Sequence, residues 1–409
     1  MKRLLLLSTT TGYQAAEFRK AAERIRVPLV LASDRCHVLE DPWRDGAIPI
    51  RLEEPKESAG KIVEFARANP IQGLVALGDP ITLIAALAAR ELDLPFHPPE
   101  AVEVCRDKYL FRERCRMAGL PVPWYSRLPA AEPPKTPDVP FPCVLKPLGL
   151  SASRGVIRAD NAAEFRAAFD RIRALLRRVR GDAAQWIQVE SFIPGREVAV
   201  EGIVTAGRLR VLAIFDKPDP LDGPFFEETI YVTPSRLDPA TQQTLVAATE
   251  KAVAAVGLWH GPVHAEMRLN EGGVWMLEMA ARPIGGLCAR ALRFSGDMPL
   301  EELILRHALG EDISGLEREK QAAGVMMIPI PRAGILEGVE NVGAALATSG
   351  VESIEITAKL GQELVPLPEG SSYLGFIFAR AATPEAVGEA LRAAHAKLHF
   401  RLNAALRVM

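Results

Sequence analysis

Apolar and polar positions alternate along the first hundred residues in the way that is typical of strands followed by helices. Short apolar runs predict strands, and the amphipathic stretches between them predict helices. The expected strands are 2–8, 28–32 and 73–77, and the expected helices are 13–25, 58–68 and 82–92. Such alternation indicates a parallel sheet with helices on its faces. Ligands of these sheets bind beyond the carboxyl ends of the strands, where loops 8–12 and 78–80 lie. Helix capping by Thr and Asp is the alternative reading of these loops.

The stretch FPCVLKPLGLSASRGVIR, at 141–158, has a strand pattern followed by a loop of small residues. It predicts a strand from Cys143 to Lys146, a loop at 149–155 and a second strand from Val156. Glycines at both ends of the loop let backbone N–H groups approach phosphate oxygens and let the loop close over them, and Lys146 would add a positive charge. An ordinary hairpin loop is the alternative. The sequence contains neither a P-loop nor a GxGxxG string, so a phosphate site here is of another kind.

The stretch 261–286 predicts two strands joined by a turn at 270–273. With a three-residue loop at 271–273, Glu266 lies opposite Glu278, and His264 lies opposite Ala280 on the same face. Like charges that face each other destabilise a sheet unless a cation neutralises them, and carboxylates bind Mg²⁺. The hairpin is therefore a candidate metal platform for a nucleotide. A pair of exposed glutamates that serve solubility is the alternative.

Two further stretches carry candidate nucleotide contacts. Asp107 is expected to cap a helix over 108–118. Lys108 in the first turn of that helix opposes the helix dipole, which indicates a bound anion. The stretch 186–202 predicts a strand that ends near Glu190, a Pro-Gly connector, and a strand from Glu197.

Taken in order, these stretches resemble the ATP-grasp family, and the resemblance implies a role for each matching residue. The implied phosphate contacts are Lys108, Lys146, Ser151, Ser153, Gly155 and, from AIFDKPDP, Lys217. Adenine is implied to lie against Glu190, Phe192 and Ile193, and the ribose against Glu197. Glu266 and Glu278 are the implied ligands of Mg²⁺, for which Mn²⁺ can substitute, and Arg282 faces the reacting centre. The implied catalytic set is Arg282, Lys146 and Glu278, and the candidate substrate contacts are His264, Glu228, Gly285 and Gly286.

The fold class expected from the patterns and the resemblance combines α/β and α+β parts. We expect an N-terminal parallel α/β (pre-ATP-grasp) domain over 1–106, a two-lobed ATP-grasp domain over 107–310, and a small C-terminal α+β domain over 311–409. The last domain shows strand patterns at 322–340, 351–359 and 371–381 and a helix at 383–398. It resembles the C-terminal domain of the amino-acid ligase branch. A proline-rich connector at 129–142 and a helix at 161–180 belong to the middle domain.

Composition narrows the function classes. The chain has 49 basic and 51 acidic residues and a net charge of −2, which gives no global basic field for nucleic acid. Its five cysteines include no CxxC pair, which argues against a disulfide framework or a zinc site. No apolar run approaches the roughly 18 residues of a membrane span. We therefore expect a cytoplasmic enzyme that acts on small molecules, with a homodimer as one assembly.

The resemblance implies an ATP-dependent carboxylate–amine ligase. Such an enzyme activates a carboxylate, here expected to be that of an amino acid, as an acylphosphate and releases ADP and phosphate as the amide or peptide bond forms. The chain departs from the family at Ala280, where members usually carry Asn. Our hypothesis is that a water or His264 takes over part of the role of that amide. The alternatives are a carboxylase or purine-pathway ATP-grasp enzyme and a non-catalytic ATP-binding regulator.

Overall fold

The computed structural model describes residues 2–9, 12–34, 47–132, 138–177, 179 and 182–403. Parts of the expected loop 8–12, connector 129–142 and helix 161–180 therefore lie outside the described residues. None of the helices in the described ranges is both long and apolar enough to cross a membrane.

The N-terminal part is the parallel sheet that the alternating pattern predicts. Its strands run in the order β3-β2-β1-β4, with β1 Leu4–Ser8, β2 Leu29–Ser33, β3 Ile48–Pro49 and β4 Gly73–Leu77. The helices of this part are α1 Ala15–Arg24, α2 Pro55–Ala68, α3 Asp79–Glu91 and α4 Pro99–Arg106. The predicted strand 73–77 matches β4, whereas the short β3 has no signal in the pattern.

A small antiparallel lobe follows and carries the loop of small residues. Helix α5 (Lys108–Met117) leads into it, and its strand order is β5-β8-β6-β7. The strands are β5 Tyr125–Pro129, β6 Cys143–Pro147, β7 Ile157–Ala159 and β8 Trp186–Ser191, and α6 Ala162–Leu176 packs on them. Phe165, Phe169 and Ile172 of α6 form a buried cluster with Leu145 and Val189 of the strands. The lobe therefore has an apolar core of its own.

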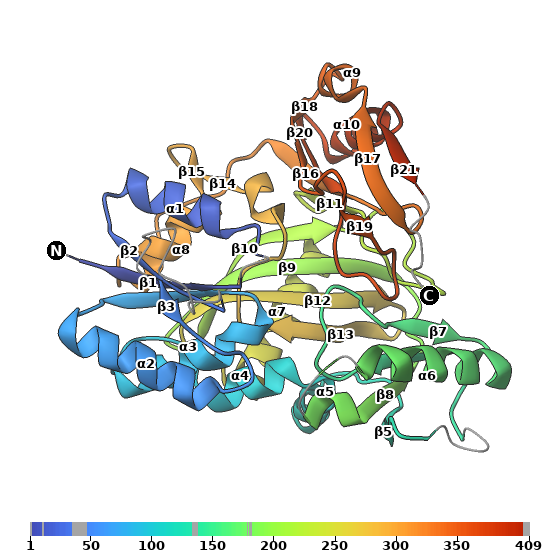
Figure 1. Cartoon of the computed structure of the whole chain (residues 1–409), viewed down its shortest axis with the longest axis horizontal. Coiled ribbons are helices and arrows are strands. Elements are labelled where there is room, and N and C mark those ends of the chain that lie inside the picture. Colours follow the sequence, from blue (N-terminus) through green and yellow to red (C-terminus); the bar gives the residue numbers. More distant parts are fainter. Residues whose placement is uncertain are drawn as a thin grey trace.

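The largest element is an eight-stranded sheet in the order β13-β12-β9-β10-β11-β16-β20-β18, which runs through the middle of the molecule (Figure 1). Its strands are β9 Arg196–Thr205, β10 Arg208–Asp216, β11 Ile230–Thr233, β12 Gly261–Asn270, β13 Gly273–Ala280, β16 Ala322–Ile328, β18 Val351–Ile356 and β20 Gly375–Ala381. β11 pairs with β16, so this sheet crosses the boundary that we expected between residues 310 and 311.

The remaining elements surround the large sheet. They are helices α7 Pro239–Val256, α8 Leu300–Ala308, α9 Val342–Leu346 and α10 Pro384–His395, the small sheet of β17 Gly334–Glu340, β19 Glu363–Leu364 and β21 His399–Asn403, and the short strands β14 Arg293–Phe294 and β15 Met298–Pro299. One apolar core contains buried residues of helices α2, α3 and α4 and of strands β9, β12 and β13. A second core joins α1 and α8 with β10, β16 and β20. The mixed fold class expected from the sequence is confirmed.

Three histidines lie where the N-terminal part meets the large sheet, of which His97 and His307 are buried and His260 is partly buried. His97 accepts a hydrogen bond from the Trp259 N–H (3.2 Å) and bonds the Pro262 carbonyl (3.1 Å). The rings of His260 and His307 stack with their centroids 4.0 Å apart. Burial lowers the pKa of His97 to about 4 and that of His307 to about 3. The folded protein therefore keeps these rings neutral.

We expect the free energy of unfolding to fall as the pH drops below about 6.5, because only the unfolded chain then protonates these histidines. Their folded-state pKa values lie below the unfolded value, so this stability is complete above about pH 6.5 and is lost towards lower pH, at up to about 1.4 kcal/mol per pH unit for each histidine. Urea unfolding across this range measures the slope. His307→Gln should reduce it, and His399→Gln, at an exposed position, should not. If the free energy of unfolding fell equally steeply with pH in the wild-type protein and both variants, His307 would not be a source of the pH dependence.

Candidate active site

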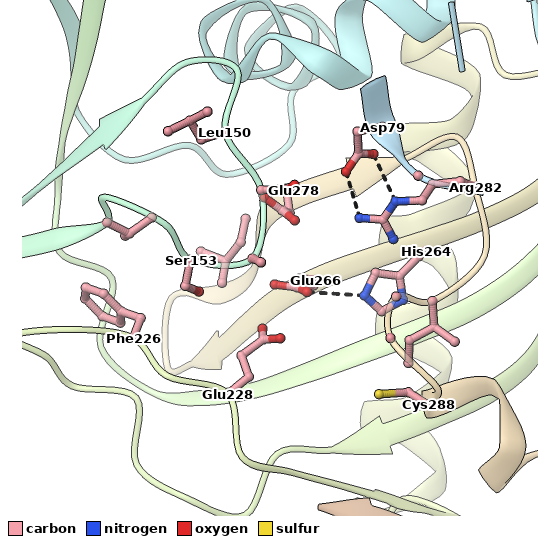
Figure 2. Close-up of a pocket in the computed structure, with 18 of the residues that line it drawn as sticks. Asp79, Leu150, Ser153, Phe226, Glu228, His264, Glu266, Glu278, Arg282 and Cys288 are labelled. Atoms are coloured by element: carbon pink, nitrogen blue, oxygen red, sulfur yellow. Dashed lines mark hydrogen bonds and ion pairs between the residues drawn. The ribbon is translucent and has the colours of Figure 1, made fainter. Parts of the chain in front are cut away.

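A cavity of about 320 Å³ opens where the N-terminal sheet, the small lobe and the large sheet meet. Thr9, in the loop after β1, and Asp79, the first residue of α3 after β4, line it from the N-terminal part. Both residues follow parallel strands, and the expected ligand contact of loops 8–12 and 78–80 stays a prediction. Residues 150–153 line it from the small lobe, and Tyr373 lines it from the C-terminal part. Figure 2 shows carboxylates of the large sheet facing the loop that carries Leu150 and Ser153.

The floor of the cavity is a polar patch on one face of the large sheet. On β12, His264, Glu266 and Arg268 alternate with the buried apolar residues Val263, Ala265 and Met267. Side chains two residues apart share one face of a strand, so the three polar groups lie side by side. On the neighbouring β9, Glu201 pairs with His264, Ala199 with Glu266, and Glu197 with Arg268. Because the side chain of Ala199 is small, it leaves space for the side chain of Glu266 to extend towards the cavity.

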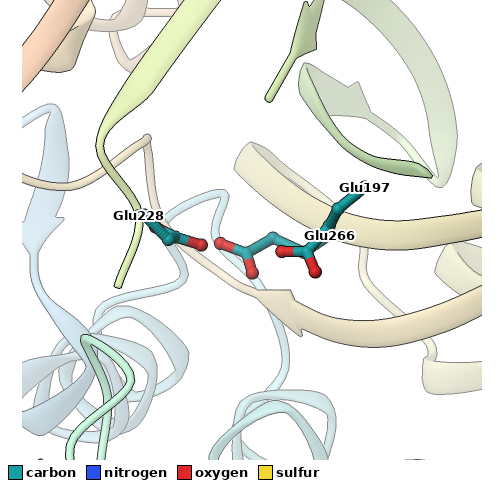
Figure 3. Close-up of side chains that lie close together, drawn as sticks. All are labelled: Glu197, Glu228 and Glu266. Carbon is teal, nitrogen blue, oxygen red and sulfur yellow. The ribbon is translucent and has the colours of Figure 1, made fainter. Parts of the chain in front are cut away.

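Glu197, Glu228 and Glu266 converge on one point, with ligand atoms within 4.8 Å of one another (Figure 3). The Lys217 ammonium lies among them, 2.8 Å from Glu197 Oε1 and 3.2 Å from Glu266 Oε2, and it also bonds Glu228. Burial and the adjacent Glu266 raise the pKa of Glu228 to about 7. Although burial opposes it, Lys217 and His264 hold the pKa of Glu266 well below its usual range. Lys217 thus partly balances three carboxylates, together with Arg268 at Glu197 and His264 at Glu266. Oxygen ligands of this kind suit a divalent cation.

His264 is bonded at both ring nitrogens. Nδ1 lies 3.1 Å from Glu201 Oε2, and Nε2 lies 3.2 Å from Glu266 Oε1. Although burial lowers it, these two hydrogen bonds raise the pKa of His264 to about 9. Glu201 in turn accepts from the Ile284 N–H at 3.1 Å. His264 therefore fixes the orientation of Glu266 beneath the cavity, and Ala280 lies across from it in the register that we expected.

The hairpin reaches that register by a different route from the one expected. The loop is a two-residue turn, because Asn270 pairs with Gly273, so the three-residue loop was wrong. A two-residue turn alone would put Glu278 on the opposite face from Glu266. A β-bulge at Leu277 shifts the register, and Glu266 then pairs with Glu278 and His264 with Ala280. The prediction that the two glutamates face each other is confirmed, and the bulge is the reason.

The loop of small residues, which we call the flap (residues 149–155), covers the cavity. Lys108 of α5 donates to the Leu150 carbonyl at 2.6 Å and lies 3.9 Å from Glu278 Oε2. Ser151 and Ser153 line the cavity, as expected of phosphate contacts. Gly155 does not, because its N–H donates to the Pro368 carbonyl at 2.8 Å. A Cβ at Gly155 would also lie 2.8 Å from Pro147 Cγ. The packing of the loop against Pro147 therefore requires glycine at this position.

Lys146 and Glu190 are held by an arginine that the sequence patterns had not singled out. Arg112 Nε and Nη2 lie 3.0 and 3.2 Å from the two Glu190 oxygens, and Lys146 bonds the same carboxylate. Although burial raises it, Arg112 and Lys146 lower the pKa of Glu190 to about 2. Arg112 Nη1 also donates to the carbonyls of Met276 and Leu277 at the bulge, at 2.9 Å each. The Glu190 carboxylate is thus occupied by cations instead of being free for adenine.

Arg282 and the two glycines after it lie at the other end of the cavity. Arg282 forms a two-pronged ion pair with Asp79, at 3.0 and 2.9 Å. Gly285 and Gly286 line the cavity, as expected of substrate contacts. A Cβ at Gly286 would lie 2.9 Å from the Phe376 ring, and its φ is +61°. Close packing therefore requires this glycine whether or not a ligand is bound.

The connector expected to hold adenine also lines the cavity, through Phe192 and Ile193. The Phe192 N–H donates to Pro142 at 2.9 Å, and the Ile193 carbonyl accepts from Arg268 at 2.7 Å. Arg268 also bonds Glu197 at 2.9 Å. The Glu197 carboxylate is therefore shared between Arg268 and Lys217, and the ribose contact expected of it stays a prediction.

Several residues that line the cavity or contact its lining lie outside the set expected from the sequence, and some of them carry a signal in the sequence. Arg112 follows Lys108 by four positions, so both lie on one helix face. Glu201 follows Glu197 by four positions in a strand, so both lie on one sheet face. Tyr231, Cys288 and Met327, which also line the cavity, have no such signal because apolar residues of the core show the same pattern.

Comparisons with known proteins agree with this geometry. Residues 139–291 match the ATP-grasp domain, residues 19–96 match the ATP-grasp N-terminal domain, and residues 326–403 match L-amino acid ligase C-terminal domain 2. The chain therefore contains an ATP-grasp domain, preceded by a segment that matches the ATP-grasp N-terminal domain and followed by one that matches the C-terminal domain of L-amino acid ligases.

The chain is also similar to individual ligases. The crystal structure of an L-amino acid ligase from Bacillus licheniformis superimposes with a TM-score of 0.84 and 26% identity, over 98% of this chain and 99% of that one. Alanine–anticapsin ligase of Bacillus subtilis is 27% identical over 57% of this chain and 52% of its own length. Carnosine synthase 1 of Gallus gallus is 28% identical over 73% and 34%. The chain thus spans about half or less of the length of these two curated relatives.

The Arg112–Glu190 pair is expected to be essential for stability. Arg112→Leu should lower the free energy of unfolding by roughly 3 kcal/mol, because it leaves a buried carboxylate with one cation fewer. Arg116→Leu on the same helix is the matched control, because the pair of Arg116 with Glu113 is largely exposed and the substitution should cost much less stability. Urea unfolding of both variants at neutral pH measures the difference. Equal losses would show that the buried pair is not special.

Proposed function

We propose that the protein is an ATP-dependent carboxylate–amine ligase that activates an amino acid as an acylphosphate and joins it to an amine. The observation that carries the proposal is the pairing of opposite charges across one cavity. Carboxylates on the large sheet face lysines and the flap of the small lobe. This arrangement suits a triphosphate that lies between the two lobes with a divalent cation.

In this proposal, ATP lies under the flap. Lys108, Lys146 and the serines of the flap contact its phosphates, and the adenine edge meets the Phe192 carbonyl and the Ile193 N–H. Lys217 moves from the carboxylate cluster towards the γ-phosphate. The cations offset the repulsion between two anions and the charge that develops on transfer.

The metal ligands of the proposal are Glu266 and Glu278, with Glu197 close enough to contribute. Their oxygens fit Mg²⁺, or Mn²⁺ in its place, and the bound ion would shield the phosphates from the carboxylates. His264 keeps Glu266 oriented through Glu201, which is our account of how the site accommodates Ala280 in place of an amide.

The reaction consists of two displacements. A carboxylate oxygen of the amino acid attacks the γ-phosphorus, the bond to the β-bridging oxygen breaks, and ADP leaves with the electron pair. Arg282 stabilises the resulting acylphosphate. The amine nitrogen then attacks the acyl carbon, and phosphate leaves as the C–O bond breaks. Because both nitrogens of His264 are bonded to carboxylates, we assign the proton released by the amine to Glu228.

The side chain of the amino acid has an apolar surface to occupy. Tyr231, Cys288, Met327 and Tyr373 line the cavity next to Glu228 and Ile284. These groups bring no unpaired positive charge for an acidic side chain, so we expect an apolar amino acid as the activated substrate.

A phosphate-release screen with ATP, Mg²⁺ and pairs of amino acids tests the proposal, with the product identified by mass spectrometry. We expect release that requires both partners, gives one amide per phosphate, and favours apolar carboxyl donors. Release that requires bicarbonate instead would indicate the carboxylating alternative. Tight ATP binding without turnover for any pair would favour the regulator.

Glu278→Gln is expected to reduce turnover roughly a hundredfold or more, because it removes a metal ligand and a charge that the transition state needs. Glu271→Gln, in the exposed turn of the same hairpin, is the control and should keep wild-type rates. Thermal melting establishes that both variants are folded. Wild-type turnover in a folded Glu278→Gln protein would remove Glu278 from the metal site.

A further inference from the structure

Next to the flap, the small lobe contacts the segment 368–369 of the C-terminal part. The Pro368 carbonyl accepts from the Gly155 N–H at 2.8 Å, and the Glu369 carbonyl accepts from Arg154 Nε at 2.9 Å. The Glu369 carboxylate forms a two-pronged pair with Arg171 of α6, in which Nη2 lies 2.9 Å from Oε2. We call this set of contacts the latch.

The residues that form the latch lie outside the lining of the cavity. Leu150, Ser151, Ala152 and Ser153 line the cavity, whereas Arg154 and Gly155, the next two residues of the flap, bond the C-terminal part instead. The flap therefore has one end over the ligand site and the other end tied to a different domain. Lys108 holds the ligand end through the Leu150 carbonyl.

The segment that supplies the latch is itself built tightly. The Gly370 N–H donates to the Pro366 carbonyl at 2.9 Å, and a Cβ at Gly370 would lie 1.8 Å from the Val365 carbonyl oxygen. Tyr373, three residues further on, lines the cavity. One short segment thus presents the latch at one end and a wall of the ligand site at the other.

The energetics favour a latch that opens. The small lobe has its own apolar core, so it can move as a unit when polar contacts to its neighbours break. The side chains of Arg171 and Glu369 are 46% and 38% exposed, and ion pairs this exposed are weak and screened by salt. Such contacts hold the flap closed while allowing it to release product.

We propose that Arg154 and Glu369 are positioning residues that keep the flap closed during the reaction and so couple ATP use to amide formation. Neither residue lines the cavity, so they act through the flap. While the flap is closed, water is excluded from the acylphosphate. When the latch is weakened, ADP escapes sooner and water competes with the amine for the acyl carbon. The second of these effects rests on the proposed function, and the first does not.

The test compares Arg154→Met and Glu369→Gln with the wild-type protein in two assays. Stopped-flow dissociation of a fluorescent ADP analogue with Mg²⁺ should accelerate roughly three- to tenfold in Arg154→Met, the change expected from loss of one hydrogen bond. In the coupled reaction, phosphate released per amide formed should rise above one in both variants. Arg154→Lys, which keeps the charge and a donor, should restore part of the coupling.

Two controls separate the latch from general effects. Arg173→Gln removes a positive charge from α6, where its partner is Asp170, and Glu389→Gln removes an exposed carboxylate from α10. Both should behave as the wild-type protein does. Wild-type ADP release and coupling in Arg154→Met and Glu369→Gln would overturn the proposal. If no amino-acid pair gives an amide, the proposed function fails, and ADP release alone then decides the latch.

Discussion

The site depends on the burial of several carboxylates on one face of a sheet. Removing a carboxylate from water is costly unless cations and hydrogen bonds compensate for it. Here Lys217 is shared among Glu197, Glu228 and Glu266, and His264 bridges Glu266 to a fourth glutamate, Glu201, through its ring nitrogens. The compensation is partial, so the cavity suits a divalent cation, as in the function that we propose. In that proposal, the need to neutralise the carboxylates would link metal, nucleotide and substrate in one cavity.

The buried carboxylates lie on a sheet that packs into two large cores, whereas the small lobe above them has a separate core. β9, β12 and β13 share an apolar core with the N-terminal helices, and β10, β16 and β20 share another with α1 and α8. These cores fix the floor of the cavity. The small lobe, in contrast, packs around a separate core and meets the C-terminal part through polar contacts. A charged floor beneath a lobe with its own core suits the proposed reaction, which must exclude water and then release ADP.

Arg112 shows how one side chain can connect these two parts. It pairs with Glu190 of the small lobe and donates to the carbonyls of Met276 and Leu277, where the bulge in β13 frees them. The same bulge turns Glu278 towards Glu266. The position of Glu278, a proposed metal ligand, and that of Glu190, the partner of Lys146, therefore both depend on the Arg112 guanidinium.

The sequence by itself determined the elements and the residue types of the site. Alternation of strands and helices predicted the parallel sheet, and polar residues at alternate positions in an apolar strand marked His264 and Glu266 as neighbours on one face, because the strand repeat is local. Tertiary structure alone decided which groups meet. The pairing of Arg282 with Asp79, of Arg112 with Glu190, and of the flap with Glu369 joins residues far apart in the chain. No local repeat encodes such contacts, since they depend on how separate cores pack against one another.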